Sequence, residues 1–378
     1  MNASAIRELV RPEVPALPPY NAGLSSEAVR SRYGVEHIAR LASNENPFGA
    51  SPKVGRALAD LALRVGTYPD ANCTALRAAI AERTGASAEQ VVIGNGSESI
   101  LQMLCQAFLS PGDRVLTQRP AFGLHEIYPR MMGAQVELLA LTPTLEFDLD
   151  AWCEALARGP KIAMLANPSN PVGCMFDAQA FARLLDATPA GTLLVIDEAY
   201  YEYARLARGF PDALAALRAQ QRPWIVLRTF SKAWGLAGLR VGYGIASDAS
   251  LIQWLDRVRT PFNVNEAAQA AALAAWSDEP FMAKTVEDTV QQRERVVQQL
   301  RAMDLPGLRV APSAANFLFI DLARPNGPVN EALLARGIIV KPWKEPGFES
   351  FIRVSIGTAD DNARFLRALG EIVGASPA

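Results

Sequence analysis

Short apolar runs alternate with stretches of helical periodicity through most of the chain, and this alternation limits the possible folds more than any other feature. The apolar runs are VVIG (91–94), RVLTQ (114–118), QVELLAL (135–141), KIAMLA (161–166), TLLVID (192–197), WIVLRT (224–229) and VGYGIA (241–246). Helical patterns lie between most of them, for example after Asp148 and after Asp177. This alternation is typical of α/β proteins. We therefore predict a mostly parallel sheet with helices on both faces.

The two ends of the chain have a different pattern. Residues 1–45 are rich in proline and turn-forming residues and predict an N-terminal arm that wraps over a surface. One long, charged helix is expected at 281–303, followed by strands near 317–321 and 351–356 and by helices around Val329 and Asp360. We therefore expect an arm (1–45), a large domain (46–278) and a small α+β C-terminal domain (279–378), with the long helix as the bridge.

Composition argues against several classes of function. The 378 residues carry a net charge of −2 and no basic block, which disfavours nucleic acid as a partner. The N-terminus lacks the pattern of a signal peptide, and no apolar run reaches the roughly 18 residues of a membrane span. The four widely spaced cysteines indicate free thiols in a reducing cytoplasm. With two histidines in the chain, a multi-histidine zinc site and a Ser-His-Asp triad are both disfavoured, so we expect the reactivity to come from a bound group.

Polar or glycine- and proline-rich clusters follow several of the expected strands. They are GNGSES (94–99), RPAFGLH (119–125), NPSNPVG (167–173), DEAYYEY (197–203) and TFSK (229–232). Ligands of open α/β sheets bind beyond the carboxyl ends of the strands, so these clusters can converge on one pocket. Each also has a plain structural interpretation: a turn and N-cap for GNGS, an N-cap for Asp197, and two Asn-Pro turns for NPSNPVG.

Lys232 lies among small and apolar residues just beyond WIVLRT, where an ammonium group is poorly solvated. Its side chain either reaches water from a helix start or stays partly desolvated as a nucleophile that can form a Schiff base. Taken together, the clusters suit a phosphorylated, positively charged heterocycle. The amides of Ser97 and Glu98 would face its phosphate, Asp197 would face its positive charge, and Lys232 would supply the amine.

Motifs along nearly the whole chain resemble the pyridoxal-phosphate-dependent aminotransferases of fold type I, and within them the histidinol-phosphate aminotransferases. The matching stretches include LASNENPFGASP (41–52), TYPDANCTALRAAIA (67–81), GNGSES, NPSNPVG, VIDEAYYEYA (195–204), TFSKAWGLAGLRVGY (229–243), ANFLFID (315–321) and FIRVSIGTADDN (351–362). Their order and spacing make the resemblance to the family highly specific.

The resemblance implies pyridoxal 5'-phosphate as the cofactor and gives several residues a role toward it. Lys232 would form a Schiff base with it, and Asp197 would keep its pyridine nitrogen protonated. Tyr200 and Asn170 would donate hydrogen bonds to its phenolic oxygen. The groups that would hold its phosphate are Thr229, Ser231, Arg240 and the amides of Ser97 and Glu98.

The resemblance also implies how substrates and a second subunit meet this site. Arg353 would bind the anionic end of the substrate, Asn44 would take part in substrate binding, and Tyr20 in the arm would help to cover the site. Tyr68 would reach the cofactor phosphate of a partner subunit, so we expect a homodimer with shared active sites. An amino donor and a 2-oxo acid, 2-oxoglutarate, would react in turn by a ping-pong mechanism.

Two positions depart from the family pattern. His125 stands where the family usually has a tyrosine that stacks on the cofactor ring, and we expect the imidazole to stack instead. Lys341 stands where the family usually has an arginine that contacts the phosphate of histidinol phosphate; a lysine binds phosphate only as a point charge. These departures leave open an aromatic amino acid aminotransferase or an enzyme of broad specificity. A threonine-phosphate decarboxylase, which shares the fold and most motifs, and a non-catalytic binding module are further alternatives; the intact Lys232, Asp197 and Arg240 argue against the module.

Overall fold

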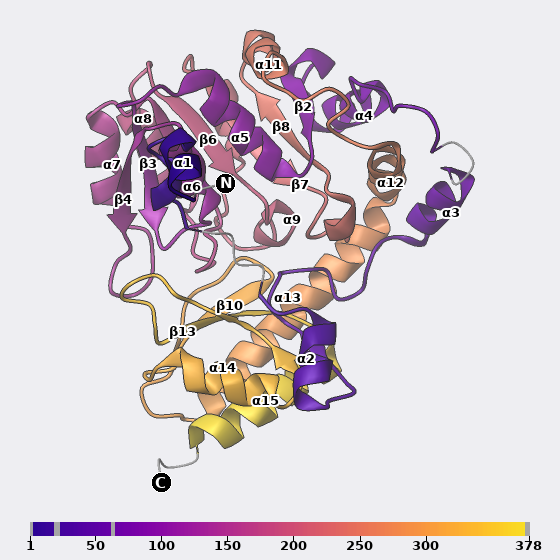
Figure 1. Cartoon of the computed structure of the whole chain (residues 1–378), viewed down its shortest axis with the longest axis vertical. Coiled ribbons are helices and arrows are strands. Elements are labelled where there is room, and N and C mark those ends of the chain that lie inside the picture. The colour runs from indigo at the N-terminus through magenta and orange to yellow at the C-terminus, as the bar shows by residue number, and fades with distance from the viewer. Residues whose placement is uncertain (1–2, 19–22, 62–64, 375–378) are drawn as a thin grey trace.

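A computed structural model describes residues 3–18, 23–61 and 65–374 of the chain. A long helix, α13 (Glu279–Ala302), runs between a large α/β part and a smaller C-terminal part (Figure 1). Among the helices that the structure describes, none has the length and apolar character needed to cross a membrane.

The large part is built on a seven-stranded sheet in the order β2-β8-β7-β6-β5-β3-β4. Its strands are β2 (Val91–Gly94), β3 (Arg114–Arg119), β4 (Gln135–Ala140), β5 (Ile162–Ala166), β6 (Leu193–Asp197), β7 (Trp224–Thr229) and β8 (Gly242–Ala246). The neighbouring strands β4, β3, β5, β6 and β7 run parallel to one another, whereas β8 is antiparallel to both of its neighbours, β2 and β7. The predicted mostly parallel sheet is confirmed.

Helices cover both faces of this sheet (Figure 1). The helices of the large part are α3 (Pro52–Leu61), α4 (Thr74–Thr84), α5 (Ser97–Phe108), α6 (Leu124–Met131), α7 (Leu149–Ala157), α8 (Ala178–Ala187), α9 (Tyr201–Ala204), α10 (Ala213–Arg218), α11 (Ala249–Asp256) and α12 (Glu266–Trp276). Of these, α3 packs against α12 and not against the sheet. Several begin at an N-cap whose side chain accepts a backbone N–H, as Asp148, Asp177 and Asp212 do.

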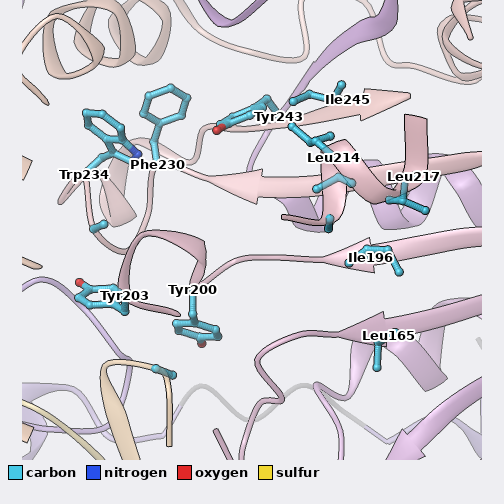
Figure 2. Close-up of a cluster of buried hydrophobic side chains, with 14 of the residues drawn as sticks. Leu165, Ile196, Tyr200, Tyr203, Leu214, Leu217, Phe230, Trp234, Tyr243 and Ile245 are labelled. Carbon is cyan, nitrogen blue, oxygen red and sulfur yellow. The ribbon is translucent and has the colours of Figure 1, made fainter. Parts of the chain in front are cut away.

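Alternate residues of the strands pack into two separate apolar cores. On β6, Leu194 and Ile196 belong to the core under α4, α7, α8 and α12, whereas Leu193 and Val195 face the core under α5 and α11. Figure 2 shows part of the first core, in which aromatic side chains continue past the strand ends toward Tyr200. Burial on both faces holds the carboxyl ends of the strands in fixed positions.

The C-terminal part has its own sheet and its own core. Its elements after α13 are β9 (Arg309–Val310), β10 (Phe317–Asp321), α14 (Asn326–Leu334), β11 (Ile338–Ile339), β12 (Lys341–Pro342), β13 (Phe351–Ser355) and α15 (Ala359–Gly374). The antiparallel sheet has the order β12-β13-β10-β9. The expected smaller α+β part is therefore present.

The N-terminal segment contains α1 (Ala3–Leu9), a 3-10 turn (Val14–Ala16), α2 (Ser26–Tyr33) and β1 (Ala39–Arg40). Strand β1 pairs in parallel with β11, and Val29 of α2 packs against Leu334 and Ile339. Helix α2 and strand β1 therefore lie against the C-terminal part, beside α14 and α15, whereas α1 lies at the large part (Figure 1), where Arg11 donates a hydrogen bond to the Met131 carbonyl of α6. The exact domain boundaries at residues 45 and 278 stay a prediction.

Candidate active site

A cavity of about 550 Å³ lies at the carboxyl ends of the central strands. All of the polar clusters that follow the strands in sequence contribute to its wall, and segments before and after them complete it. Its polar lining residues are Ser43, Asn44, Ser97, Glu98, Asn170, Asp197, Tyr200, Thr229, Ser231, Lys232, Arg240, Lys341 and Arg353. The structure thus brings together nearly every residue that the sequence placed in the site.

Lys232 extends into this cavity from the turn after β7. Its Nζ donates a hydrogen bond to the backbone carbonyl of Ser43, 2.9 Å away, and lies 6.0 Å from the centre of the Tyr200 ring. Burial, together with the positive charges of Arg353 and Arg240, lowers the pKa of Lys232 to about 7. A substantial fraction of the amine is therefore neutral at neutral pH and can act as a nucleophile.

Asp197 ends β6, and both of its carboxylate oxygens have partners. Oδ1 accepts the backbone N–H of Ala199 at 3.0 Å, and Oδ2 lies 3.1 Å from Nε2 of His125. Because an ionised carboxylate can only accept, the imidazole donates its Nε2–H. Among the described residues, Nδ1 of His125 has no hydrogen-bond partner. The carboxylate is thus held in one orientation at the floor of the cavity.

The expected stacking role of His125 does not fit this geometry. Its ring is 0% exposed, lies behind Asp197, and is not among the side chains that line the cavity. Phe122, three positions earlier, lines the cavity and meets the His125 ring edge-on with 5.8 Å between centroids. The aromatic face at this wall therefore belongs to Phe122, and His125 contacts the carboxylate instead.

Tyr200, Asn44 and Asn170 also line the cavity. The Asn44 amide donates to the Tyr200 hydroxyl at 2.9 Å, and burial raises the pKa of Tyr200. The hydroxyl therefore keeps its proton and can donate it to an acceptor in the cavity. Oδ1 of Asn170 accepts a hydrogen bond from Arg353 at 2.7 Å, which leaves the Asn170 amide nitrogen available as a donor.

A compact anion site lies where α5 begins. Gly96 is the residue before the helix, at φ +75°, and a Cβ there would lie 2.5 Å from a terminal nitrogen of Arg240. Arg240 approaches the Ser231 hydroxyl at 3.4 Å and Glu98 at 3.2 Å. A guanidinium beside free helix N-terminal amides suits a phosphate group. The glycine is needed because any side chain would displace Arg240.

Lys341 and Arg353 bring two positive charges to the far side of the cavity. They are direct cross-strand partners of β12 and β13, so both side chains leave the sheet on the same face. The Arg353 guanidinium donates to the Ala42 carbonyl at 2.6 Å and lies 6.0 Å from the Trp343 ring centre. Burial and the charges of Arg353 and Lys344 lower the pKa of Lys341. The sequence did not single out Trp343, which lies outside the clusters, or Phe122, because within RPAFGLH (119–125) the stacking role was expected of His125.

Tyr68 is not among the residues that line the cavity. This residue is 81% exposed and stacks on Phe262 with 4.5 Å between ring centroids. Tyr20 lies outside the described residues, so its expected role stays a prediction.

The chain matches the family description of class I and II aminotransferases over residues 36–369. Histidinol-phosphate aminotransferase 3 of Rhizobium meliloti (strain 1021) is 46% identical over 363 residues, which are 96% of this chain and 97% of that protein. Histidinol-phosphate aminotransferase 1 of Mesorhizobium japonicum is 45% identical over 370 residues, which are 98% of this chain and 100% of that protein. A crystal structure of histidinol-phosphate aminotransferase from Sinorhizobium meliloti in complex with pyridoxal-5'-phosphate superimposes with a TM-score of 0.86 at 27% identity, over 97% of each chain.

Proposed function

Because this chain belongs to the class I and II aminotransferases, we propose that it transfers the amino group of histidinol phosphate to 2-oxoglutarate, giving imidazole acetol phosphate and glutamate. The cofactor is pyridoxal 5'-phosphate. Because the members of this family are enzymes, the alternative of a non-catalytic binding module is excluded.

The residues present fit the cofactor in charge and shape. The N-terminus of α5, Arg240 and the hydroxyls of Thr229 and Ser231 would hold its phosphate, in the space that Gly96 keeps open. Asp197 would pair with its ring nitrogen, and Phe122 would lie against its ring. When bound, pyridoxal phosphate supplies an aldehyde that reacts with amines and a ring that accepts electrons from the reacting carbon.

Lys232 is proposed as the residue that attaches covalently to the cofactor and later moves the proton. A pKa of about 7 lets its Nζ exist as a neutral amine, which can first attack an aldehyde and, once released, accept a proton from a substrate carbon. The Ser43 carbonyl, 2.9 Å from Nζ, would hold the amine in place while it is not attached to the cofactor.

Other side chains would keep the required charges in place. Asp197, fixed by His125 and the Ala199 amide, presents a negative charge to the ring nitrogen. Tyr200 and Asn170 would donate hydrogen bonds to the phenolic oxygen, since the first keeps its proton and the second has its amide nitrogen available.

The observation that carries the choice of amino donor is the Lys341–Arg353 pair. Like charges directly opposite on one strand pair are unfavourable, and a ligand with two negative charges would offset this repulsion better than one with a single charge. A phosphate monoester is a dianion near neutral pH, whereas the carboxylate of an aromatic amino acid is a monoanion. The pair therefore favours histidinol phosphate over phenylalanine or tyrosine.

Arg353 would also bind the carboxylate of glutamate and 2-oxoglutarate, so that donor and acceptor use the same site in turn. Alternate use of one site gives ping-pong kinetics. Asn44, next to Tyr200 in the wall, would contact the substrate from the other side.

We further propose that the active form is a homodimer in which Tyr68 reaches the cofactor phosphate of the other subunit, and that it works in the cytoplasm. The exposed Tyr68–Phe262 stack and the four free thiols agree with these two proposals.

Single-turnover absorbance spectra of the cofactor-loaded protein test the proposed function. Histidinol phosphate, phenylalanine, tyrosine and glutamate are presented separately, without an acceptor. We expect rapid conversion of the cofactor by histidinol phosphate and by glutamate. Much faster conversion by phenylalanine or tyrosine than by histidinol phosphate would identify an aromatic amino acid aminotransferase instead, and release of carbon dioxide from threonine phosphate would identify a decarboxylase.

A further inference from the structure

A second cavity, of about 780 Å³, adjoins the catalytic cavity. The two cavities share the wall residues Ala42, Ser43, Gly123, Lys341 and Trp343. We call the second cavity the vestibule. Because Ser43 contacts Lys232, and Lys341 is the cross-strand partner of Arg353, a substrate held at the catalytic cavity can extend directly into the vestibule.

The vestibule lies between the N-terminal segment and the C-terminal part. Much of its wall is apolar, with Leu24, Leu334, Ile339, Pro342 and Trp343 among the contributors. Such a surface suits a flat ring of the substrate better than a charged substituent.

Some of the charges around the vestibule are engaged with one another. Arg30 pairs with Glu27 at 3.4 Å, and Arg40 pairs with Glu45 at 2.8 Å. Each of these pairs carries no net charge, so neither pair favours ligands of one charge over those of another.

Glu345 also has a basic neighbour, but the two groups are less closely paired. Its carboxylate lies 3.8 Å from Nε of Arg119, too far for a hydrogen bond, and its side chain remains 32% exposed. Burial raises the pKa of Glu345 to about 6, although Arg119 and a hydrogen bond from the backbone of Ala121 act in the opposite direction. It is two residues from Trp343, which lines both cavities. A carboxylate on a largely apolar wall is a strong hydrogen-bond acceptor for a ligand N–H.

We propose that Glu345 is a specificity residue that accepts a hydrogen bond from the ring N–H of a nitrogen heterocycle on the amino donor. The phosphate end of the donor lies at Lys341 and Arg353, and its ring enters the vestibule. This inference rests on the proposed function, since it takes the imidazole of histidinol phosphate as the heterocycle.

The size of the vestibule cannot distinguish a nitrogen heterocycle from a hydrocarbon ring, because a cavity of about 780 Å³ admits imidazole, phenyl and larger rings equally. A polar contact can select between rings, since a ring without an N–H cannot offer the Glu345 carboxylate this additional hydrogen bond. Imidazole also titrates near pH 6.5 in its free form, so part of it carries a proton and strengthens the contact.

The test compares Glu345→Gln with Glu27→Gln as the matched control. Glu27 lies on the same vestibule wall but pairs with Arg30, so its substitution removes the same charge from the same cavity. The donor half-reaction is measured with histidinol phosphate, phenylalanine and glutamate. Equilibrium binding of histidinol phosphate is measured in the Lys232→Ala background, where turnover cannot contribute.

We expect Glu345→Gln to lower kcat/KM and affinity for histidinol phosphate about tenfold, because the glutamine oxygen can still accept the N–H but lacks the negative charge that strengthens the hydrogen bond. Phenylalanine and glutamate should be unaffected, and Glu27→Gln should behave as wild type. Equal losses for all donors, no loss for any, or the same loss in Glu27→Gln would overturn the role of Glu345 while leaving the proposed function intact. A wild-type protein that converts glutamate but not histidinol phosphate would overturn the proposed function and this inference with it.

Discussion

Replacing Lys341 by methionine tests whether this side chain recognises a dianionic donor. Methionine keeps much of the length of the side chain and removes only the charge. Lys341 faces the catalytic cavity opposite Arg353, and its lowered pKa reflects burial and the neighbouring positive charges. Arg353 keeps its bonds to Asn170 and the Ala42 carbonyl in the variant, so one anion contact remains.

The expected loss follows from the contact that is removed. A hydrogen bond to a charged group contributes about 1.5–3 kcal/mol, which corresponds to roughly ten- to more than a hundredfold in rate or affinity. We expect kcat/KM for histidinol phosphate to fall by about that factor. Glutamate presents a single charge to Arg353, so its half-reaction should change little.

We expect the Lys341→Met substitution to leave the stability of the fold intact. Like charges directly opposite in a strand pair cost about 0.2–1 kcal/mol, so removing one of them should leave the melting temperature unchanged or slightly higher. This separates a loss of recognition from a loss of structure. Lys344→Met is the matched control, since it removes the same charge from an exposed residue three positions away.

Stopped-flow absorbance of the cofactor during each half-reaction gives the two values of kcat/KM independently. An equal loss for histidinol phosphate and glutamate would refute the reasoning, because the charge would then serve both substrates. A neutral result for all donors would remove Lys341 from substrate recognition.

Further substitutions address the cofactor site and the assembly. Lys232→Ala should retain pyridoxal phosphate without covalent attachment and lose transamination, and borohydride reduction of the wild type followed by peptide mapping should label Lys232 and no other lysine. Because the pKa of Lys232 is lowered to about 7, covalent capture of the cofactor by the cofactor-free protein should accelerate as the pH rises through 7. The stability of that protein should also rise from pH 7 toward 10, since the unfolded chain holds the lysine proton more tightly over this range; a flat profile in calorimetry would contradict the shift. Asp197→Asn should fold normally and lose at least about a hundredfold in turnover, and a near-normal rate would exclude Asp197 from catalysis. Sedimentation should show a dimer. Mixing the Lys232→Ala and Tyr68→Phe variants should yield hybrid dimers in which one active site carries neither substitution. An active monomer would contradict the proposal that the subunits share their active sites.

Much of the large part could be predicted from sequence because burial on both faces makes its strands read as continuous apolar runs. β5 and β6 were found in this way, and the N-cap aspartates Asp148 and Asp177 marked the following helices. The position of β8 was not predicted. An apolar run has the same appearance whether its neighbours are parallel or antiparallel, so its place between β2 and β7 depends on the path of the chain.

The motifs that resemble the family were enough to place Lys232 and Arg240 at one cavity, but they do not determine how the side chains are oriented. Phe122 and His125 lie three residues apart in one short segment. Which ring faces the cavity depends on how α6 rotates as it packs against the sheet, and the sequence does not specify this rotation. The pairing of Lys341 with Arg353 likewise joins residues separated by a loop of unspecified path.

The pairing of β1 with β11 makes the C-terminal part discontinuous in sequence. Ala39 and Leu41 belong to the same core as Phe365 and Leu369, so the large α/β part is inserted between two stretches that pack together. A fragment that starts at residue 279 would lack one of its own strands. The two residues that follow Leu41 also carry the carbonyls that bind Arg353 and Lys232. Any rotation of the C-terminal part would therefore displace the acceptor of the Lys232 amine directly, through the chain itself and without a relay of side chains.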